Sequence, residues 1–140
     1  MGLENYKDAE VFTDDRFQLI TKMYDKVILN LKYIIKYKEI NKPTEVLDTQ
    51  ARENYNFLIE NRTGKLQEII DIIDILKSSL DFETEELKSS SEYLYGLYEY
   101  QLLNLYKITI DLDETILKSL LNVFSELREG WKDAVKELNK

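Results

Sequence analysis

The chain of 140 residues is 44% hydrophobic and 33% charged, and its formal net charge is −8. This length suits one domain with its own apolar core, and the acidic balance argues against nucleic acid as a partner, because phosphate backbones select basic surfaces. Histidine and cysteine are both missing from the sequence, which removes the usual general base, the commonest metal ligand and the thiolate ligands. We therefore expect no enzyme, no metal and no cofactor.

Signals for membrane targeting are also missing from the sequence. No apolar stretch follows a basic N-terminal segment, so we expect no signal peptide. No uninterrupted apolar run reaches the length of a membrane span, so we expect no membrane insertion. These features predict a soluble protein.

The N-terminal part of the chain combines an irregular segment with a basic helix. Residues 1–12 lack a helical period, which indicates a flexible arm with Tyr6, Val11 and Phe12 as apolar anchors. A helix is predicted over about residues 14–40, because apolar residues then recur at helical spacing until Pro43 ends the pattern. This helix is basic in an otherwise acidic chain, and we expect it to lie against acidic neighbours.

The second predicted helix covers about residues 44–80 and is the longest. Its apolar stripe continues through Gly64, and one interior glycine costs only about 1 kcal/mol, so we expect one continuous helix there. At about 1.5 Å per residue the helix would extend roughly 55 Å, and it should project beyond the bundle at its start.

The third predicted helix, over about residues 83–110, carries apolar residues on two nearly opposite sides. The first stripe is expected in the core and contains Leu94, Tyr98, Leu102 and Leu105. The second contains Tyr93, Gly96, Tyr100 and Leu103. These four residues either wedge against flanking helices or form a groove for a partner, in which the glycine would let another backbone approach closely.

The last predicted helix covers about residues 113–138 and carries Trp131 at an in-register position expected in the core. Four helices with short connections predict an all-α, antiparallel four-helix bundle as one domain over residues 13–140, with the extended second helix and the N-terminal arm attached. Di-iron sites of such bundles need two Glu-x-x-His motifs, which a chain without histidine cannot supply.

Three segments resemble the flagellar secretion chaperones of the FliS family. They are Ile-Leu-Lys-Ser-Ser-Leu-Asp (residues 75–81), Leu-Tyr-Glu-Tyr (residues 97–100) and Leu-Arg-Glu-Gly-Trp-Lys-Asp-Ala-Val (residues 127–135). The similarity is good over residues 72–135 and looser in the first helix, where Lys26 stands at the position of a family glycine and the family's proline is missing. Residues 43–62 resemble an extension of the family's second helix.

The resemblance implies a cytoplasmic, ATP-independent chaperone. Such a protein binds the disordered C-terminal region of flagellin, prevents premature polymerisation and aids flagellar type III secretion. The resemblance also implies that the arm residues Tyr6, Val11 and Phe12 cover part of the client groove when no client is bound. Two alternatives remain open: a helical assembly module that forms a homodimer through the tyrosine side of the third helix, or a chaperone for another secreted flagellar subunit.

Overall fold

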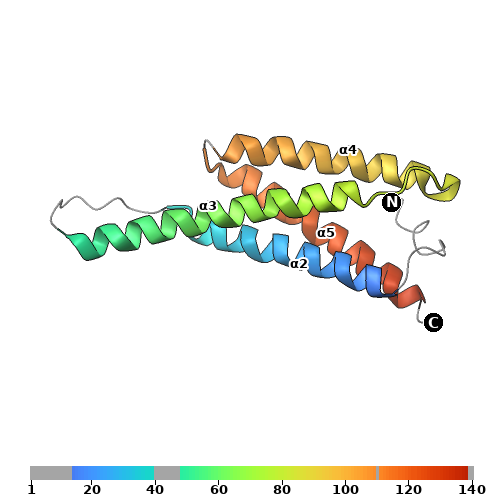
Figure 1. Ribbon diagram of the computed structural model, residues 1–140, viewed down its shortest axis with the longest axis horizontal. Coiled ribbons are helices and arrows are strands. Elements are labelled where there is room, and N and C mark those ends of the chain that lie inside the picture. Colours follow the sequence, from blue (N-terminus) through green and yellow to red (C-terminus); the bar gives the residue numbers. More distant parts are fainter. Residues whose placement is uncertain (1–13, 40–47, 110, 139–140) are drawn as a thin grey trace.

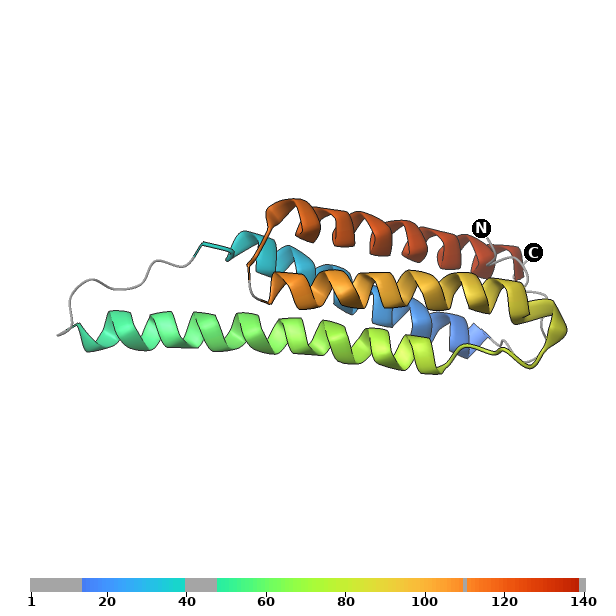
Figure 2. The ribbon, with the colours of Figure 1, turned by 90° about the horizontal axis from the view of Figure 1, so that it is seen from above.

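The computed structural model describes residues 14–39, 48–109 and 111–138. These residues form four helices: α2 (Asp14–Lys36), α3 (Thr49–Ser78), α4 (Glu85–Ile108) and α5 (Glu114–Leu138). Consecutive helices run in opposite directions along one another (Figures 1 and 2). Helix α2 packs against α3 and α5, and α4 packs against the same two helices, so α2 and α4 are diagonal across the bundle. The predicted antiparallel four-helix bundle is confirmed, whereas the predicted arm lies outside the described residues.

Aspartate side chains cap the starts of α3 and α5. One carboxylate oxygen of Asp48 accepts a hydrogen bond from the backbone N–H of Ala51 at 3.0 Å, and α3 begins directly after it at Thr49. The start predicted near residue 44 was wrong, because Asp48 itself has a non-helical backbone, with φ −83° and ψ 86°. Asp113 caps α5 in the same way by accepting from the N–H of Thr115 at 2.8 Å.

The core runs along the centre of the bundle and contains the side chains expected there. Leu94 and Tyr98 of α4 are each 1% exposed, and Trp131 of α5 is 2% exposed. The indole Nε1–H of Trp131 donates a hydrogen bond to the hydroxyl of Tyr24 at 2.8 Å, and that hydroxyl also bonds with the hydroxyl of Tyr98. Since buried polar groups need partners, this chain of bonds lets three large aromatic side chains from α2, α4 and α5 meet in the core.

Helix α3 is continuous through Gly64, as predicted, and it projects beyond the other helices at its start. All five of its buried residues lie in its second half, between Leu66 and Leu76. Both ribbon views show its first half extending past the ends of the other three helices (Figures 1 and 2). With 30 residues, α3 is about 45 Å long, against about 35 Å for α2.

The base of this projection is attached to the end of α2. The guanidinium of Arg62 donates to the backbone carbonyl oxygens of Tyr37 and Lys38, at 3.3 and 2.9 Å. Tyr37 and Lys38 directly follow Lys36, the last residue of α2, so their carbonyls accept from a side chain of α3 at the point where the chain leaves the helix. Helix α2 ends at Lys36, four residues earlier than predicted. Arg62 of α3 thereby satisfies backbone carbonyls where the chain leaves α2.

Candidate partner-binding surface

One apolar stripe of α4 faces solvent. Tyr93, Tyr100 and Leu103 are 51, 60 and 58% exposed, and Gly96 lies exposed between the two tyrosines. We call these four residues the tyrosine face. The structure therefore brings the four predicted residues together on one solvent-exposed side of α4.

The exposure of the tyrosine face follows from helical geometry. Leu94, Tyr98 and Leu105 point into the core, so residues on the opposite side of the same helix point outward. Gly96 has open space around it, since a Cβ placed there would meet no atom within 4 Å. No packing constraint therefore requires glycine, although it costs roughly 0.5–1 kcal/mol relative to alanine in a helix.

Other aromatic side chains extend this surface around α4. Of the five tyrosines between Tyr93 and Tyr106, only Tyr98 is buried. Tyr95 packs edge to face against Phe82, with ring centroids 5.8 Å apart, and both rings are about two-fifths exposed. The ammonium group of Lys77 lies 5.6 Å from the centre of the Tyr95 ring. Aromatic groups thus line the side of α4 that faces α3 as well as its outer side.

A second apolar surface lies between α2 and α3, near the start of α2 and the end of α3. We call it the α2–α3 groove. It is a cavity of about 260 Å³, lined by Arg16, Leu19, Ile20, Met23, Ile75 and Ser79. Leu19 and Ile75 are 54 and 52% exposed, although both are large and aliphatic. An exposed pair of this kind at a hollow is typical of a docking site for an apolar side chain.

The sequence-based prediction missed Leu19 and Ile75. Both residues are adjacent to positions of the core stripes, Ile20 in α2 and Leu76 in α3, but do not belong to those stripes. The signal available in the sequence was an additional aliphatic residue next to an already complete core stripe, once in α2 and once in α3. Their pairing became visible only once α2 and α3 were placed side by side.

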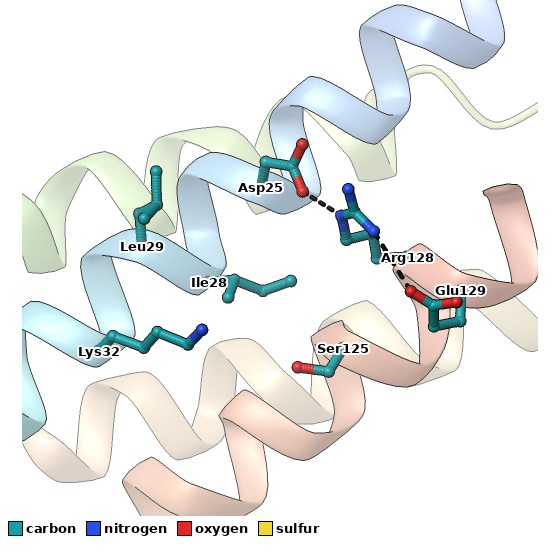
Figure 3. Close-up of a pocket in the computed structure, with 7 residues that line it drawn as sticks. All are labelled: Asp25, Ile28, Leu29, Lys32, Ser125, Arg128 and Glu129. Carbon is teal, nitrogen blue, oxygen red and sulfur yellow. Dashed lines mark hydrogen bonds and ion pairs between the residues drawn. The ribbon is translucent and has the colours of Figure 1, made fainter.

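A third hollow lies between α2 and α5 and has a charged lining (Figure 3). Its volume is about 490 Å³, and it is lined by Asp25, Ile28, Leu29, Lys32, Ser125, Arg128 and Glu129. Arg128 forms ion pairs with Asp25 and with Glu129. The hydrogen bond and charge of Asp25 raise the pKa of Arg128, which therefore stays charged.

Neither a metal-binding cluster nor a membrane-spanning helix occurs in the described part of the chain. Among those residues no cluster of three or more acidic, histidine or cysteine side chains is placed to hold a metal ion. No helix over the same residues is both long enough and apolar enough to cross a membrane. The predicted arm residues Tyr6, Val11 and Phe12 lie outside the described residues.

Comparisons with known proteins agree with this picture of a helical binding protein. The family model described as flagellar protein FliS matches residues 2–138. The match covers nearly the whole chain, including α2, where the motif resemblance was loosest. A search of curated proteins gave no significant match. The chain belongs to the FliS family of flagellar proteins, which are flagellin export chaperones and not enzymes.

Proposed function

We propose that this FliS chaperone holds the disordered C-terminal segment of flagellin against two surfaces, the tyrosine face of α4 and the α2–α3 groove. Membership of the family makes the chain a flagellin export chaperone in flagellar assembly. The proposal adds which part of flagellin is bound and where. The observation that supports it most directly is the solvent exposure of Tyr93, Tyr100 and Leu103 on a helix that already has a complete core stripe.

The chemistry of the two surfaces suits an amphipathic segment that folds on binding. Such a segment presents apolar side chains at helical spacing, and a chaperone hides them by offering a matching apolar surface. Tyr93 and Tyr100 provide large contact areas with few rotatable bonds and hydroxyl groups that tolerate water at the edge of the contact. The α2–α3 groove, with Leu19 and Ile75 at its sides, provides a hollow for a single aliphatic anchor.

The positions of the two surfaces imply the path of the client. The tyrosine face is on α4 and the groove lies between α2 and α3, while α3 packs against both α2 and α4. The shortest path for a segment that contacts both surfaces therefore passes around α3, the helix that packs against both α2 and α4. One straight helix cannot follow such a path, but a disordered chain that folds in short pieces can. We propose that the client wraps the bundle in this way.

The proposal also assigns a role to the N-terminal arm. Phe12 is only four residues from Arg16, which lines the α2–α3 groove, and four residues span at most about 14 Å. Tyr6, Val11 and Phe12 are therefore the residues we propose to cover the groove when no client is bound. Deleting residues 2–12 should raise the association rate for the client without weakening the final complex, as measured by stopped-flow fluorescence.

Isothermal titration calorimetry of the full chain with a flagellin C-terminal peptide tests the function. We expect a 1:1 complex with a negative heat-capacity change, because apolar surface is buried on binding. Hydrogen exchange in the complex should slow in the client and at the start of α2. Absence of measurable heat and of exchange protection would contradict the proposal. Peptides from other secreted flagellar subunits, run in parallel, separate flagellin from the alternative clients.

The exposed tyrosine face also suits the second candidate, a homodimer formed through that face. The observation that favours it is the same exposure of Tyr100 and Leu103. Sedimentation at several protein concentrations distinguishes the two functions. A dimer that persists in the presence of the flagellin peptide supports assembly, whereas a monomer that becomes a 1:1 complex supports the chaperone.

A further inference from the structure

The hollow between α2 and α5 is separate from both proposed client surfaces. We call it the α2–α5 trough, with Asp25, Ile28, Leu29, Lys32, Ser125, Arg128 and Glu129 as its lining. It shares no residue with the α2–α3 groove or with the tyrosine face. Since α4 is diagonal to α2, the trough lies on the side of the bundle away from the seam between α3 and α4. A client that passes around α3 leaves it uncovered.

The trough combines an apolar middle with polar ends. Ile28, 8% exposed, lies between the Lys32 side chain and the Arg128 pair, and Lys32 and Ser125 extend toward the space between the two helices (Figure 3). Leu29 lies at the edge of the hollow. Its side chain is 63% exposed, whereas that of the adjacent Ile28 is buried. An aliphatic residue exposed beside a hollow is a candidate anchor for a partner side chain.

The charges of the trough leave one cation uncompensated. Arg128 is already engaged by Asp25 and Glu129, whereas Lys32 has no carboxylate partner among the residues that the structure describes. Lys26, the preceding cation in α2 and six residues earlier, is paired with Glu68 of α3. The predicted arrangement of a basic helix against acidic neighbours therefore holds for Lys26 but not for Lys32.

The charge of Lys32, unpaired among the described residues, contrasts with the negative charge of the whole chain. Helix α2 is the only one of the four described helices with more basic than acidic residues, in a chain of net charge −8. The negative electrostatic field of such a chain attracts cationic partners and repels acidic ones. An acidic partner would therefore approach best at α2, which carries five basic and three acidic residues. The trough lining itself is formally neutral, and its charge without a partner among the described residues is that of Lys32 at one end.

We infer that the α2–α5 trough binds a second protein partner through an acidic amphipathic helix. One carboxylate of that helix contacts the ammonium of Lys32 and the hydroxyl of Ser125, and an aliphatic side chain packs on Ile28 and Leu29. A seam between two adjacent helices is a surface into which a third helix fits. Asp25 and Glu129 at the other end disfavour a phosphate-rich or anionic lipid surface, which would place many negative charges along the whole trough.

Because the trough and the client surfaces are separate, the partner and the client should bind together. Simultaneous binding rests on the proposed client surfaces, but not on which segment of flagellin occupies them. A chaperone carrying its client would still present Leu29 and Lys32 to the second partner. The structure thus assigns one side of the bundle to holding the client and the other to recognition by a further protein.

The test uses the full chain and a synthetic helical peptide of about five turns, with leucines along one side and glutamates flanking them. Matched peptides carry glutamine or lysine in place of glutamate. By fluorescence anisotropy we expect the glutamate peptide to bind at least about tenfold more tightly than either control, and Lys32→Glu to weaken it by at least about tenfold. Lys22→Glu, the same charge reversal at an exposed position of α2 outside the trough, should change it less than about twofold.

Methyl and amide NMR spectra then locate the peptide. Shifts should concentrate at Ile28, Leu29 and Ser125 and should persist in the presence of the flagellin peptide. Equal binding of the glutamine peptide, equal effects of Lys22→Glu and Lys32→Glu, or shifts at Leu19 and Ile75 instead would each overturn the inference. So would sedimentation showing that Leu29→Ser dissociates a dimer, or flotation showing Lys32-dependent binding to anionic vesicles without peptide binding.

Discussion

The two sides of α4 carry similar residues, but one side is buried in the core and the other is exposed to solvent. Tyr98 and Leu94 are 1% exposed, whereas Tyr100 and Leu103, on the other side of the same helix, are 60 and 58% exposed. The hydroxyl of Tyr98 bonds with that of Tyr24 in the core. Amino-acid type therefore does not separate the stabilising residues of this helix from the binding residues that we propose. The direction in which each side chain points separates them.

A matched pair of substitutions should give the largest difference. Tyr98→Ala removes a fully buried ring and leaves a cavity, so we expect it to lower the free energy of unfolding by about 3–5 kcal/mol. Tyr100→Ala removes the same atoms from the surface and should change it by less than about 0.5 kcal/mol. Urea denaturation followed by circular dichroism measures both. Similar losses in the two variants would show that the exposed side of α4 also contributes to stability.

Client binding should show the opposite dependence. The double substitution Tyr100→Ala and Leu103→Ala should weaken the flagellin peptide at least about tenfold, equivalent to about 1.4 kcal/mol, because it removes two anchors from the proposed contact. Stability should stay within about 1 kcal/mol of the unmodified chain. Phe57→Ala is the control, since Phe57 is 64% exposed on the projecting half of α3. Calorimetry that finds equal weakening in the control would contradict the assigned face.

Removing a single oxygen atom isolates the polar part of the core stripe. Tyr98→Phe keeps the ring and deletes its hydrogen bond with Tyr24, so we expect a loss of about 1 kcal/mol in the free energy of unfolding. Tyr100→Phe should have no measurable effect on stability. Thermal denaturation by calorimetry compares the two variants. An unchanged melting temperature for Tyr98→Phe would mean that the bond between the two hydroxyls contributes little.

Gly96→Ala separates helix propensity from recognition. A methyl group at this position meets open space, so the variant should be stabilised by about 0.5–1 kcal/mol through the better helix propensity of alanine. If a client backbone approaches closely there, the same methyl should weaken client binding severalfold. Paired denaturation and binding measurements test both effects. Increased stability together with unchanged affinity would remove Gly96 from the contact.

The smallest expected effect concerns the loop that positions α4. Asp81 accepts hydrogen bonds from the backbone N–H of Thr84 and from its hydroxyl, which lower the pKa of Asp81. A carboxyl whose pKa is lowered in the folded state stabilises the fold above its unfolded pKa of 3.8, and this contribution is lost as pH falls through the lower folded value.

Asp81→Asn should therefore reduce stability slightly at neutral pH and should show no difference from the unmodified chain in strong acid. The backbone carbonyl of Asp81 also accepts a hydrogen bond from the hydroxyl of Ser91, a fully buried residue of α4. The loop thus helps to set which side of α4 faces the core. Denaturation at a series of pH values measures the effect, and a constant difference at every pH would exclude titration of Asp81 as its cause.

The predictions from sequence succeeded where local spacing carries the information. The four helices, the continuity of α3 through Gly64 and the burial of Tyr98 and Trp131 all follow from apolar residues at helical spacing. The start of α3 was predicted too early, because several nearby residues can cap a helix and only the structure identifies Asp48 as the one that does. The role of Arg62 at the end of α2 was missed because it depends on a contact between two helices.

The sequence alone determined the all-α class, the absence of histidine and cysteine chemistry, and the four residues that share the outer side of α4. These properties depend on composition and on the geometry of one helix at a time. Tertiary structure alone decided that those residues are exposed, that Leu19 meets Ile75 in a groove, and that Lys32 faces a trough beside α5 without a partner among the described residues. Such features arise between helices, and the neighbours and rotation of each helix are set by packing of the whole bundle.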